Sequence, residues 1–133
     1  MISFESFTPA AGIPIYLQII SHIQRGIAAG TVTDGEEMPS RRVLSALLGI
    51  NPNTAQKAYR ILEEEGLIES RAGAKSYIRL TPETVEAIRK RLLLREIQST
   101  VHTLKEMGLT REEALAYVRD FWDAPAEQED GHD

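Results

Sequence analysis

Apolar residues along this chain recur mostly at spacings of three and four, which is the repeat of one face of an α-helix. Stretches with this repeat are bounded by residues that begin or end helices, such as prolines in a first turn and glycines after a last turn. They predict helices over residues 15–29, 41–48, 52–65, 82–107 and 111–122. Two short runs, 68–71 and 76–80, are joined by a glycine-bearing segment and predict a β-hairpin. The opening run 2–7 alternates apolar and polar residues and predicts a short strand or an ordered arm.

The segment between Met38 and Arg79 combines a short helix, a tight turn, a second helix and a hairpin. Gly49 is expected to end the short helix, and Asn51 followed by Pro52 is a strong start for the second one. The major groove of a DNA duplex accepts one α-helix, and this layout presents one beside a hairpin. The segment therefore predicts a mainly helical fold with a small β-wing, a winged helix-turn-helix, in contact with DNA.

The predicted helix 52–65 has two chemically different faces. Apolar side chains at helical spacing predict its inner face: Ala55, Ala58, Tyr59 and Leu62. Amide and basic side chains make up its outer face: Asn53, Gln56, Lys57 and Arg60. Amides can pair with adenine, whereas lysine and arginine can reach guanine or phosphate. An ordinary solvated face is the alternative for such a helix on its own, but the neighbouring turn and wing favour contact with DNA.

Basic residues flank this helix on both sides. Arg41 and Arg42 stand at the N-terminus of helix 41–48, where cations oppose the helix dipole, so a phosphate is an expected partner. In the wing, Gly73 permits close approach of the backbone and Lys75 adds a charge, which favours contact with phosphate or with a minor groove. The alternatives are exposed surface arginines and an ordinary exposed turn. Four apolar residues of helix 41–48 are expected to face inward: Val43, Leu44, Leu47 and Leu48.

The net charge of −5 is unusual for a protein that binds DNA, but the charge is unevenly distributed. Residues 11–80 hold 8 lysines and arginines against 7 acidic residues, whereas residues 81–133 hold 7 against 12. The acidic excess therefore lies after residue 80. Because the local field steers phosphate binding more than the net charge does, the composition is compatible with DNA binding.

Composition also excludes several other classes of protein. The chain has no cysteine, which excludes disulfides, thiolate zinc sites and cysteine nucleophiles. No apolar run approaches the ~20 residues of a membrane span, and no signal-peptide pattern opens the chain, so the cytoplasm is the expected compartment and no membrane contact is expected. The histidines, His22, His102 and His132, lie in separate segments without metal-ligand spacing. With no catalytic motif either, we expect a protein that is not an enzyme and that needs no cofactor or metal.

Several short motifs between residues 12 and 80 resemble one known family. They are Pro14-Ile15-Tyr16-Leu17-Gln18-Ile19, Met38-Pro39-Ser40-Arg41-Arg42-Val43-Leu44, Leu48-Gly49-Ile50-Asn51-Pro52-Asn53-Thr54 and Glu65-Gly66-Leu67-Ile68. Together they resemble the N-terminal domain of GntR-family bacterial transcription regulators. The short C-terminal region resembles the YtrA-like subfamily, whose members are dimers. The resemblance implies that Arg42 contacts DNA, and that further contacts fall at Asn51, Asn53, Thr54, Gln56 and Gly73.

The sequence also departs from that family at three positions. Pro52 and Gln56 stand where many members carry arginine, so the DNA target need not follow the operators of the wider family. Lys75 stands where a second glycine is usual, which adds charge to the tip of the wing.

The region after residue 80 is too short to enclose a pocket by itself. Residues 81–122 hold the last two predicted helices, and the acidic segment 123–133 is expected to be disordered. Two such helices cannot bury both of their apolar sides within one chain, so a second copy is expected to cover them. The predicted dimer interface comprises Val85, Ile88, Leu92, Ile97, Val101, Leu104, Leu115, Val118, Phe121 and Trp122. Packing against the chain's own winged domain, residues 1–80, is the alternative.

These observations predict a sequence-specific DNA-binding regulator, a repressor in preference to an activator, that binds an inverted repeat as a homodimer. A two-fold dimer would place two recognition helices about 34 Å apart, or ~10 base pairs. The main alternative is a winged-helix adaptor that binds proteins without specific DNA binding, which the overall acidity motivates. A small-molecule effector held between the paired helices is a third hypothesis, suggested only by the aromatic residues Tyr117, Phe121 and Trp122.

Overall fold

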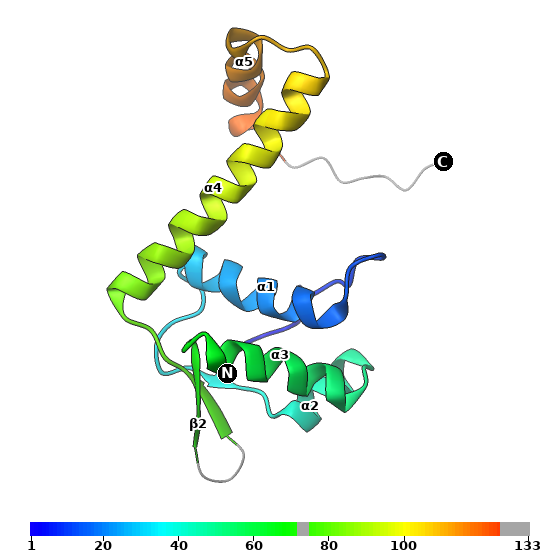
Figure 1. Ribbon diagram of the computed structural model, residues 1–133, viewed down its shortest axis with the longest axis vertical. Coiled ribbons are helices and arrows are strands. Elements are labelled where there is room, and N and C mark those ends of the chain that lie inside the picture. The colour runs from blue at the N-terminus through cyan, green and yellow to red at the C-terminus, as the bar shows by residue number, and fades with distance from the viewer. Residues whose placement is uncertain (72–74, 126–133) are drawn as a thin grey trace. The chain divides into compact units, whose positions relative to one another are not determined.

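The computed structural model describes residues 1–71 and 75–125. Along the chain it has α1 (Ile15–Ala29), β1 (Glu37–Met38), α2 (Arg41–Leu48), α3 (Pro52–Glu64), β2 (Ile68–Arg71), β3 (Lys75–Ile78), α4 (Pro82–Glu106) and α5 (Arg111–Trp122) (Figure 1). The helices agree with the predicted ranges to within one residue at each end. The mainly helical fold with a small β-wing is therefore confirmed.

Side chains at the helix ends explain why the boundaries were predictable. The Ser40 hydroxyl accepts a hydrogen bond from the Val43 amide at 3.1 Å, and the Asn51 side chain accepts one from the Asn53 amide at 2.8 Å. Gly49, at a φ of 66°, ends α2 in the left-handed conformation that glycine adopts without strain. The turn between α2 and α3 is therefore set by local chemistry.

The sheet contains a strand that the sequence pattern did not indicate. The two residues of β1 pair with β3 in antiparallel register, and the strand order is β1-β3-β2. A strand of two residues is too short to show alternation, so no periodicity could reveal it. Because β1 immediately precedes α2, it ties the start of the helix-turn-helix to the wing.

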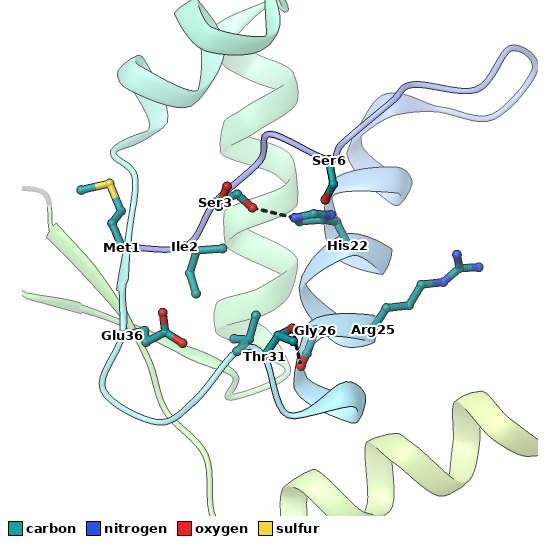
Figure 2. Close-up of a pocket in the computed structure, with 10 residues that line it drawn as sticks. Met1, Ile2, Ser3, Ser6, His22, Arg25, Gly26, Thr31 and Glu36 are labelled. Carbon is teal, nitrogen blue, oxygen red and sulfur yellow. Dashed lines mark hydrogen bonds between the residues drawn. The ribbon is translucent and has the colours of Figure 1, made fainter. Parts of the chain in front are cut away.

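The N-terminal segment is an ordered arm, one of the two predicted alternatives. The Ile2 amide donates a hydrogen bond to the Glu37 carbonyl at 3.0 Å, and the Phe4 ring stacks on His22 of α1 with ring centroids 4.6 Å apart. An edge of His22 also meets the Phe7 ring, and a His22 ring nitrogen lies 2.9 Å from the Ser3 carbonyl oxygen (Figure 2). The arm thereby covers one end of the core.

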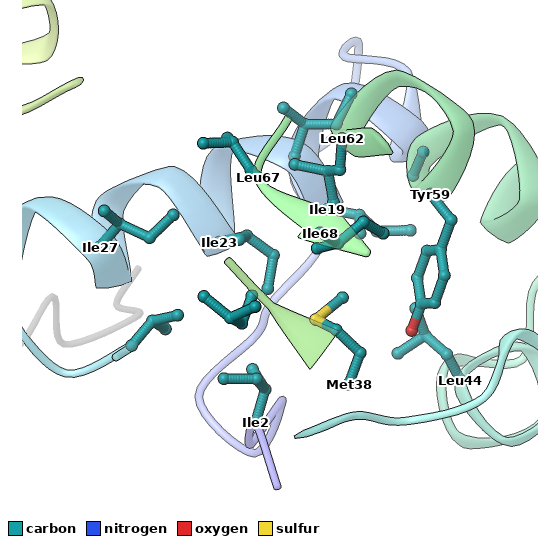
Figure 3. Close-up of a cluster of buried hydrophobic side chains, with 14 of the residues drawn as sticks. Ile2, Ile19, Ile23, Ile27, Met38, Leu44, Tyr59, Leu62, Leu67 and Ile68 are labelled. Atoms are coloured by element: carbon teal, nitrogen blue, oxygen red, sulfur yellow. The ribbon is translucent and has the colours of Figure 1, made fainter. Parts of the chain in front are cut away.

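Contacts divide the chain into two compact units, Met1–Leu93 and a second that begins at Leu94. In the first unit, α1, α2, α3, the arm and the inner face of the sheet enclose one apolar core (Figure 3). Its fully buried side chains include Ile19, Ile23, Ile27, Met38, Leu44, Tyr59, Leu62 and Ile78. This core holds α3 against α1 and α2 and leaves one side of α3 facing outward.

Two predicted inward positions on α2 are wrong. Val43 and Leu47 are 52% and 64% exposed, whereas Leu44 and Ser45 are buried. When Ala46 is included, the apolar residues spread over more than half of the circumference of this eight-residue helix, so the pattern alone did not fix its rotation. The observed rotation turns Arg41, one turn before Ser45, toward α3.

The predicted dimer interface is also corrected at its N-terminal end. Ile88 is only 5% exposed, and Val85 and Leu92 pack against the core of the first unit. The first three turns of α4 therefore belong to the chain's own core, which was the alternative that the sequence left open. For the same reason the contact boundary lies between Leu93 and Leu94, inside α4, and not at residue 80.

In the second unit most large apolar side chains remain exposed to solvent, although Leu104 of the predicted interface is half-buried. Exposed fractions range from 43% at Val101 to 79% at Trp122. Thr110 and Glu113 form a capping box that starts α5, with the Thr110 hydroxyl accepting from the Glu113 amide at 3.2 Å. The Glu113 carboxylate in turn accepts from the Thr110 amide, and this bond is the main cause that lowers the pKa of Glu113. Most of the acidic segment predicted to be disordered, residues 126–133, lies outside the described residues.

Candidate nucleic-acid interface

Helix α3 presents a polar stripe directly opposite its buried face. Ala55, Ala58, Tyr59 and Leu62 are each 0% exposed. Asn53, Gln56, Lys57 and Arg60 are all exposed, and they lie on the other side of the helix. Two alanines on the inner face allow α3 to approach its neighbours closely. The predicted division of this helix into a core face and a polar face agrees with the structure.

The two residues assigned only by resemblance lie at the N-terminus of α3. Asn51 is exposed, and its side-chain oxygen caps the helix. Thr54 is half-buried, and its amide donates to the Asn51 carbonyl at 2.9 Å. Capping fixes the first turn of α3, which is the part of a recognition helix that usually enters the groove first.

The basic residues of the stripe have partners within the chain. The Lys57 ammonium lies 4.0 Å from the centroid of the Tyr16 ring of α1. The Arg60 guanidinium lies 3.9 Å from the Glu64 carboxylate, one helical turn further along. Both side chains are exposed, so these contacts are weak and can exchange for a phosphate.

The two adjacent arginines of α2 have different surroundings. Arg42 is exposed on the outer side of the helix. The Arg41 side chain is only 24% exposed, with its guanidinium carbon 5.0 Å from the centroid of the Tyr59 ring. A carboxylate oxygen of Glu63 lies 3.8 Å from Arg41 Nη2. The structure therefore brings Arg42 to the surface but does not bring Arg41 to the exposed stripe.

The outer face of the wing carries a mixed array of charges around Tyr77. In the register, Tyr77 of β3 lies between Glu37 of β1 and Glu69 of β2, and Lys75 is opposite Arg71. Lys75 lies 3.9 Å from the Glu37 carboxylate and Arg71 lies 4.0 Å from that of Glu69. Gly73, the other predicted wing contact, lies outside the described residues.

Two wing cations were not among the predicted contacts. Arg71 covers the Tyr77 ring at 4.4 Å, and Arg79 lies 3.4 Å from the Glu69 carboxylate. Alternation along the strands was the signal that could have found them, because Lys75, Tyr77 and Arg79 recur every second residue. The wing thus offers three cations on one face, each within 4.0 Å of a carboxylate.

A separate hollow of about 530 Å³ lies beside the N-terminal arm, lined by residues that include Ser3, His22, Arg25 and Glu36 (Figure 2). A cation, a carboxylate and apolar side chains line it together, so the lining defines no single class of ligand. Among the described residues no cluster of histidine and carboxylate side chains could hold a metal ion. Within the same residues, no helix has the length and apolar character needed to cross a membrane.

Comparison with known proteins identifies the domain that carries this stripe. Residues 15–78 match the sequence family described as bacterial regulatory proteins, gntR family. The uncharacterized HTH-type transcriptional regulator YhcF of Bacillus subtilis is 33% identical over 108 residues, which are 81% of this chain and 89% of that protein. The HTH-type transcriptional repressor YtrA of the same organism is 36% identical over 66% of this chain and 68% of its own length.

The fold is shared with a solved structure over most of its length. A GntR family transcriptional regulator from Listeria monocytogenes superimposes with a TM-score of 0.76 and 28% identity, covering 84% of this chain and 98% of that one. The expected resemblance is thus confirmed, and regulators of this kind are not enzymes, as the sequence also predicted. The chain belongs to the GntR family of bacterial regulatory proteins and is a transcriptional regulator with a DNA-binding helix-turn-helix.

Proposed function

We propose that this regulator binds an inverted-repeat operator as a homodimer and represses transcription there. The observation that carries the proposal is the pair of opposite faces on α3, one fully buried and one a continuous stripe of amides and cations. Asn53 and Gln56 supply the amides that can read adenine in the major groove. Arg42, Lys57 and Arg60 supply charges for phosphate or guanine.

The homodimer is supported by the second unit. Its exposed apolar side chains include Leu94, Ile97, Val101, Leu115, Val118, Phe121 and Trp122. Exposed apolar stripes of this kind on a small unit are typical of a protein–protein interface. A second copy of the same surface is the simplest cover, because most oligomers are closed and two-fold symmetric. Of the predicted interface, we retain the residues from Ile97 onward.

Repression is supported by a relative, because the similar YtrA of Bacillus subtilis is named a transcriptional repressor. A dimer bound across a promoter can block transcription without further contacts.

Selection from a random DNA library tests the proposal most directly. We expect an enriched inverted repeat with half-site centres ~10 base pairs, or a multiple of that distance, apart. Affinity for the selected duplex should lie near ~10⁻⁸–10⁻¹¹ M and weaken steeply with salt. A flat titration at low salt, from protein shown to be folded and dimeric, would overturn the proposal and favour the protein-binding adaptor.

Single substitutions then locate the interface on the protein. Gln56→Ala should weaken binding to the selected duplex by about 1–3 kcal/mol and relax the preference at one base pair. Gln98→Ala, which removes the same kind of side chain from an exposed position on α4, is the matched control. Equal effects of the two substitutions would argue against α3 as the recognition helix.

A further inference from the structure

Arg41 is the least exposed of the basic residues that the sequence assigned to DNA contact. Its neighbour Arg42 has the same chemistry and is exposed, so the two form a natural pair for comparison. Helical periodicity places Arg41 on the side of α2 that carries Leu44 and Ser45, which are both buried. Its side chain therefore points along the junction between α2 and α3.

The contacts around Arg41 explain how a cation is accommodated at this helix start. A positive charge at the N-terminus of α2 opposes the helix dipole. The Glu63 carboxylate at 3.8 Å and the face of the Tyr59 ring at 5.0 Å both stabilise the charge. Tyr59 is itself fixed, because its hydroxyl donates to the Pro39 carbonyl just before α2. Arg41 and Tyr59 therefore connect α2 and α3 at two points.

Glu63 extends the connection from α3 to the wing. One of its carboxylate oxygens faces Arg41, and the other accepts a hydrogen bond from the Ser70 hydroxyl of β2. Ser70 is opposite Ser76 in the β2–β3 register, and Met38 of β1 is opposite Ser76 on the other side. A continuous set of polar contacts thus runs from α2 through α3 to β2.

This junction carries unsatisfied polar groups, which a core built for stability alone would avoid. Among residues 1–71 and 75–125, the buried side-chain polar atoms without a hydrogen-bond partner are Arg41 Nε and Ser76 Oγ. Arg41 belongs to this junction, and Ser76 lies opposite Ser70 in the register of β2 and β3. Unsatisfied buried groups lower stability, so the polar residues here require an explanation other than packing.

We propose that Arg41 is a positioning residue that determines DNA sequence specificity. It holds the recognition helix α3 at a fixed angle to α2 and, through Glu63 and Ser70, to the wing strand β2, and it does not itself bind a phosphate. This role rests on the proposed function, because the angle matters only if α3 and the wing meet the same duplex. Specificity depends on this angle because α3 can contact the correct base only if the wing also lies correctly on the same duplex.

The role depends on the shape of a guanidinium group and not only on its charge. A planar guanidinium can lie on the Tyr59 ring while directing N–H groups at Glu63, whereas an ammonium cannot do both. Arg41→Lys keeps the charge and removes this geometry. Arg89→Lys makes the same chemical change at an exposed arginine of α4, outside the proposed interface, and serves as the matched control.

The experiment measures binding of the full-length chain and its variants to the selected duplex and to a scrambled duplex across a range of salt concentrations. For Arg41→Lys we expect the ratio of the two affinities to fall about tenfold, the size expected for one misaligned base contact, with an unchanged salt slope. Arg89→Lys should keep the ratio, whereas Arg42→Ala, which removes a proposed phosphate contact, should reduce the salt slope by about 1. Thermal unfolding checks that each variant is folded.

Glu63→Gln separates positioning from competition for phosphate. If Glu63 merely held Arg41 back from DNA, Glu63→Gln would raise affinity for both duplexes. If the contacts position α3, the substitution lowers the affinity ratio as Arg41→Lys does, and the double variant is no worse than either single one. A raised affinity for both duplexes, or a salt slope reduced by Arg41→Ala as much as by Arg42→Ala, would overturn the proposal.

Hydrogen exchange without DNA makes the two proposals separable. Faster amide exchange across β2 in Arg41→Lys and Glu63→Gln, but not in Arg89→Lys, is expected from the contact between Glu63 and Ser70. Unchanged exchange in β2 would overturn the coupling even if DNA binding is specific. A wild type that does not distinguish the two duplexes would instead overturn the proposed function and the specificity role with it.

Discussion

The two units of this chain use the same sequence pattern with opposite outcomes. In the first unit, stripes of apolar residues at three- and four-residue spacing are buried, as Ile19, Ile23 and Ile27 of α1 are. In the second unit, stripes of equal regularity on α4 and α5 remain exposed, as at Ile97 and Phe121. The comparison teaches that an apolar stripe predicts that a helix will be covered, but not by what. In the first unit the cover is the same chain, and in the second we propose another copy.

The largest expected effect comes from removing one isoleucine from each unit. Ile23→Ala should destabilise the first unit by about 2–5 kcal/mol, because Ile23 is fully buried and the substitution leaves a cavity. Ile97→Ala makes the same change at a side chain that is 58% exposed, and should alter stability by about 0.5 kcal/mol or less in the monomer. Urea unfolding of dilute protein provides the measurement. Similar losses in both variants would mean that a single copy already covers Ile97.

A second test addresses the cover of the second unit. Trp122→Ala should weaken the homodimer by about 2 kcal/mol or more, because large aromatic residues dominate the energy of interfaces. Sedimentation over a range of concentrations measures the dissociation constant. Asp120→Asn, at an exposed polar position of the same helix, is the control. If the wild type is monomeric at every concentration, the proposed homodimer is wrong. The second unit would then not be covered by another copy of the chain.

The buried tyrosine of the first unit gives a prediction about pH. Burial raises the pKa of Tyr59 above its usual value, and nearby Arg41 offsets this only in part. Above about pH 10, the ordinary tyrosine pKa, the unfolded chain loses this proton while the folded chain keeps it. The contribution of Tyr59 to the free energy of unfolding should therefore be fully present below pH 10 and should be lost as the pH rises further. Tyr59→Phe should reduce stability by about 1 kcal/mol at neutral pH, through the lost hydrogen bond, and should flatten this alkaline decline. Parallel declines in the two proteins would show that another group is responsible.

The smallest expected effect concerns the charges of the wing. Glu69→Gln leaves Arg71 and Arg79 without their shared carboxylate, and should strengthen binding to scrambled DNA by up to about fivefold, as expected for exposed ion pairs. Glu86→Gln changes the net charge equally at an exposed position of α4. Fluorescence anisotropy at low salt can resolve the difference. Equal effects of the two substitutions would indicate that only the net charge of the protein matters and that Glu69 has no local role in the wing.

Local signals accounted for most of what the sequence predicted correctly. Caps such as Ser40 and Asn51 act within three residues, so the helix boundaries could be read from the chain. The two faces of α3 were also predictable, because its buried and exposed residues are chemically distinct. Each of these features depends on neighbours along the sequence.

Features that depend on distant neighbours were missed or assigned incorrectly. The rotation of α2 depends on which of its sides meets α3. That rotation also determines that Arg41 is directed toward Glu63. The burial of Ile88 depends on how the first turns of α4 meet a core formed by residues far earlier in the chain. The strand β1 exists only because β3 pairs with it. Periodicity within a single element contains no information about these partners.

The inclusion of Ile2 and Ile88 in the same core has a consequence for synthesis in the cell. A ribosome makes Ile2 early and Ile88 only after the whole wing, so the core cannot close around the N-terminal arm until α4 has begun to emerge. The core of the first unit therefore stays incomplete until that point. An elongation pause that holds α4 inside the ribosome should expose the unfinished core for longer than a pause after α4 has emerged.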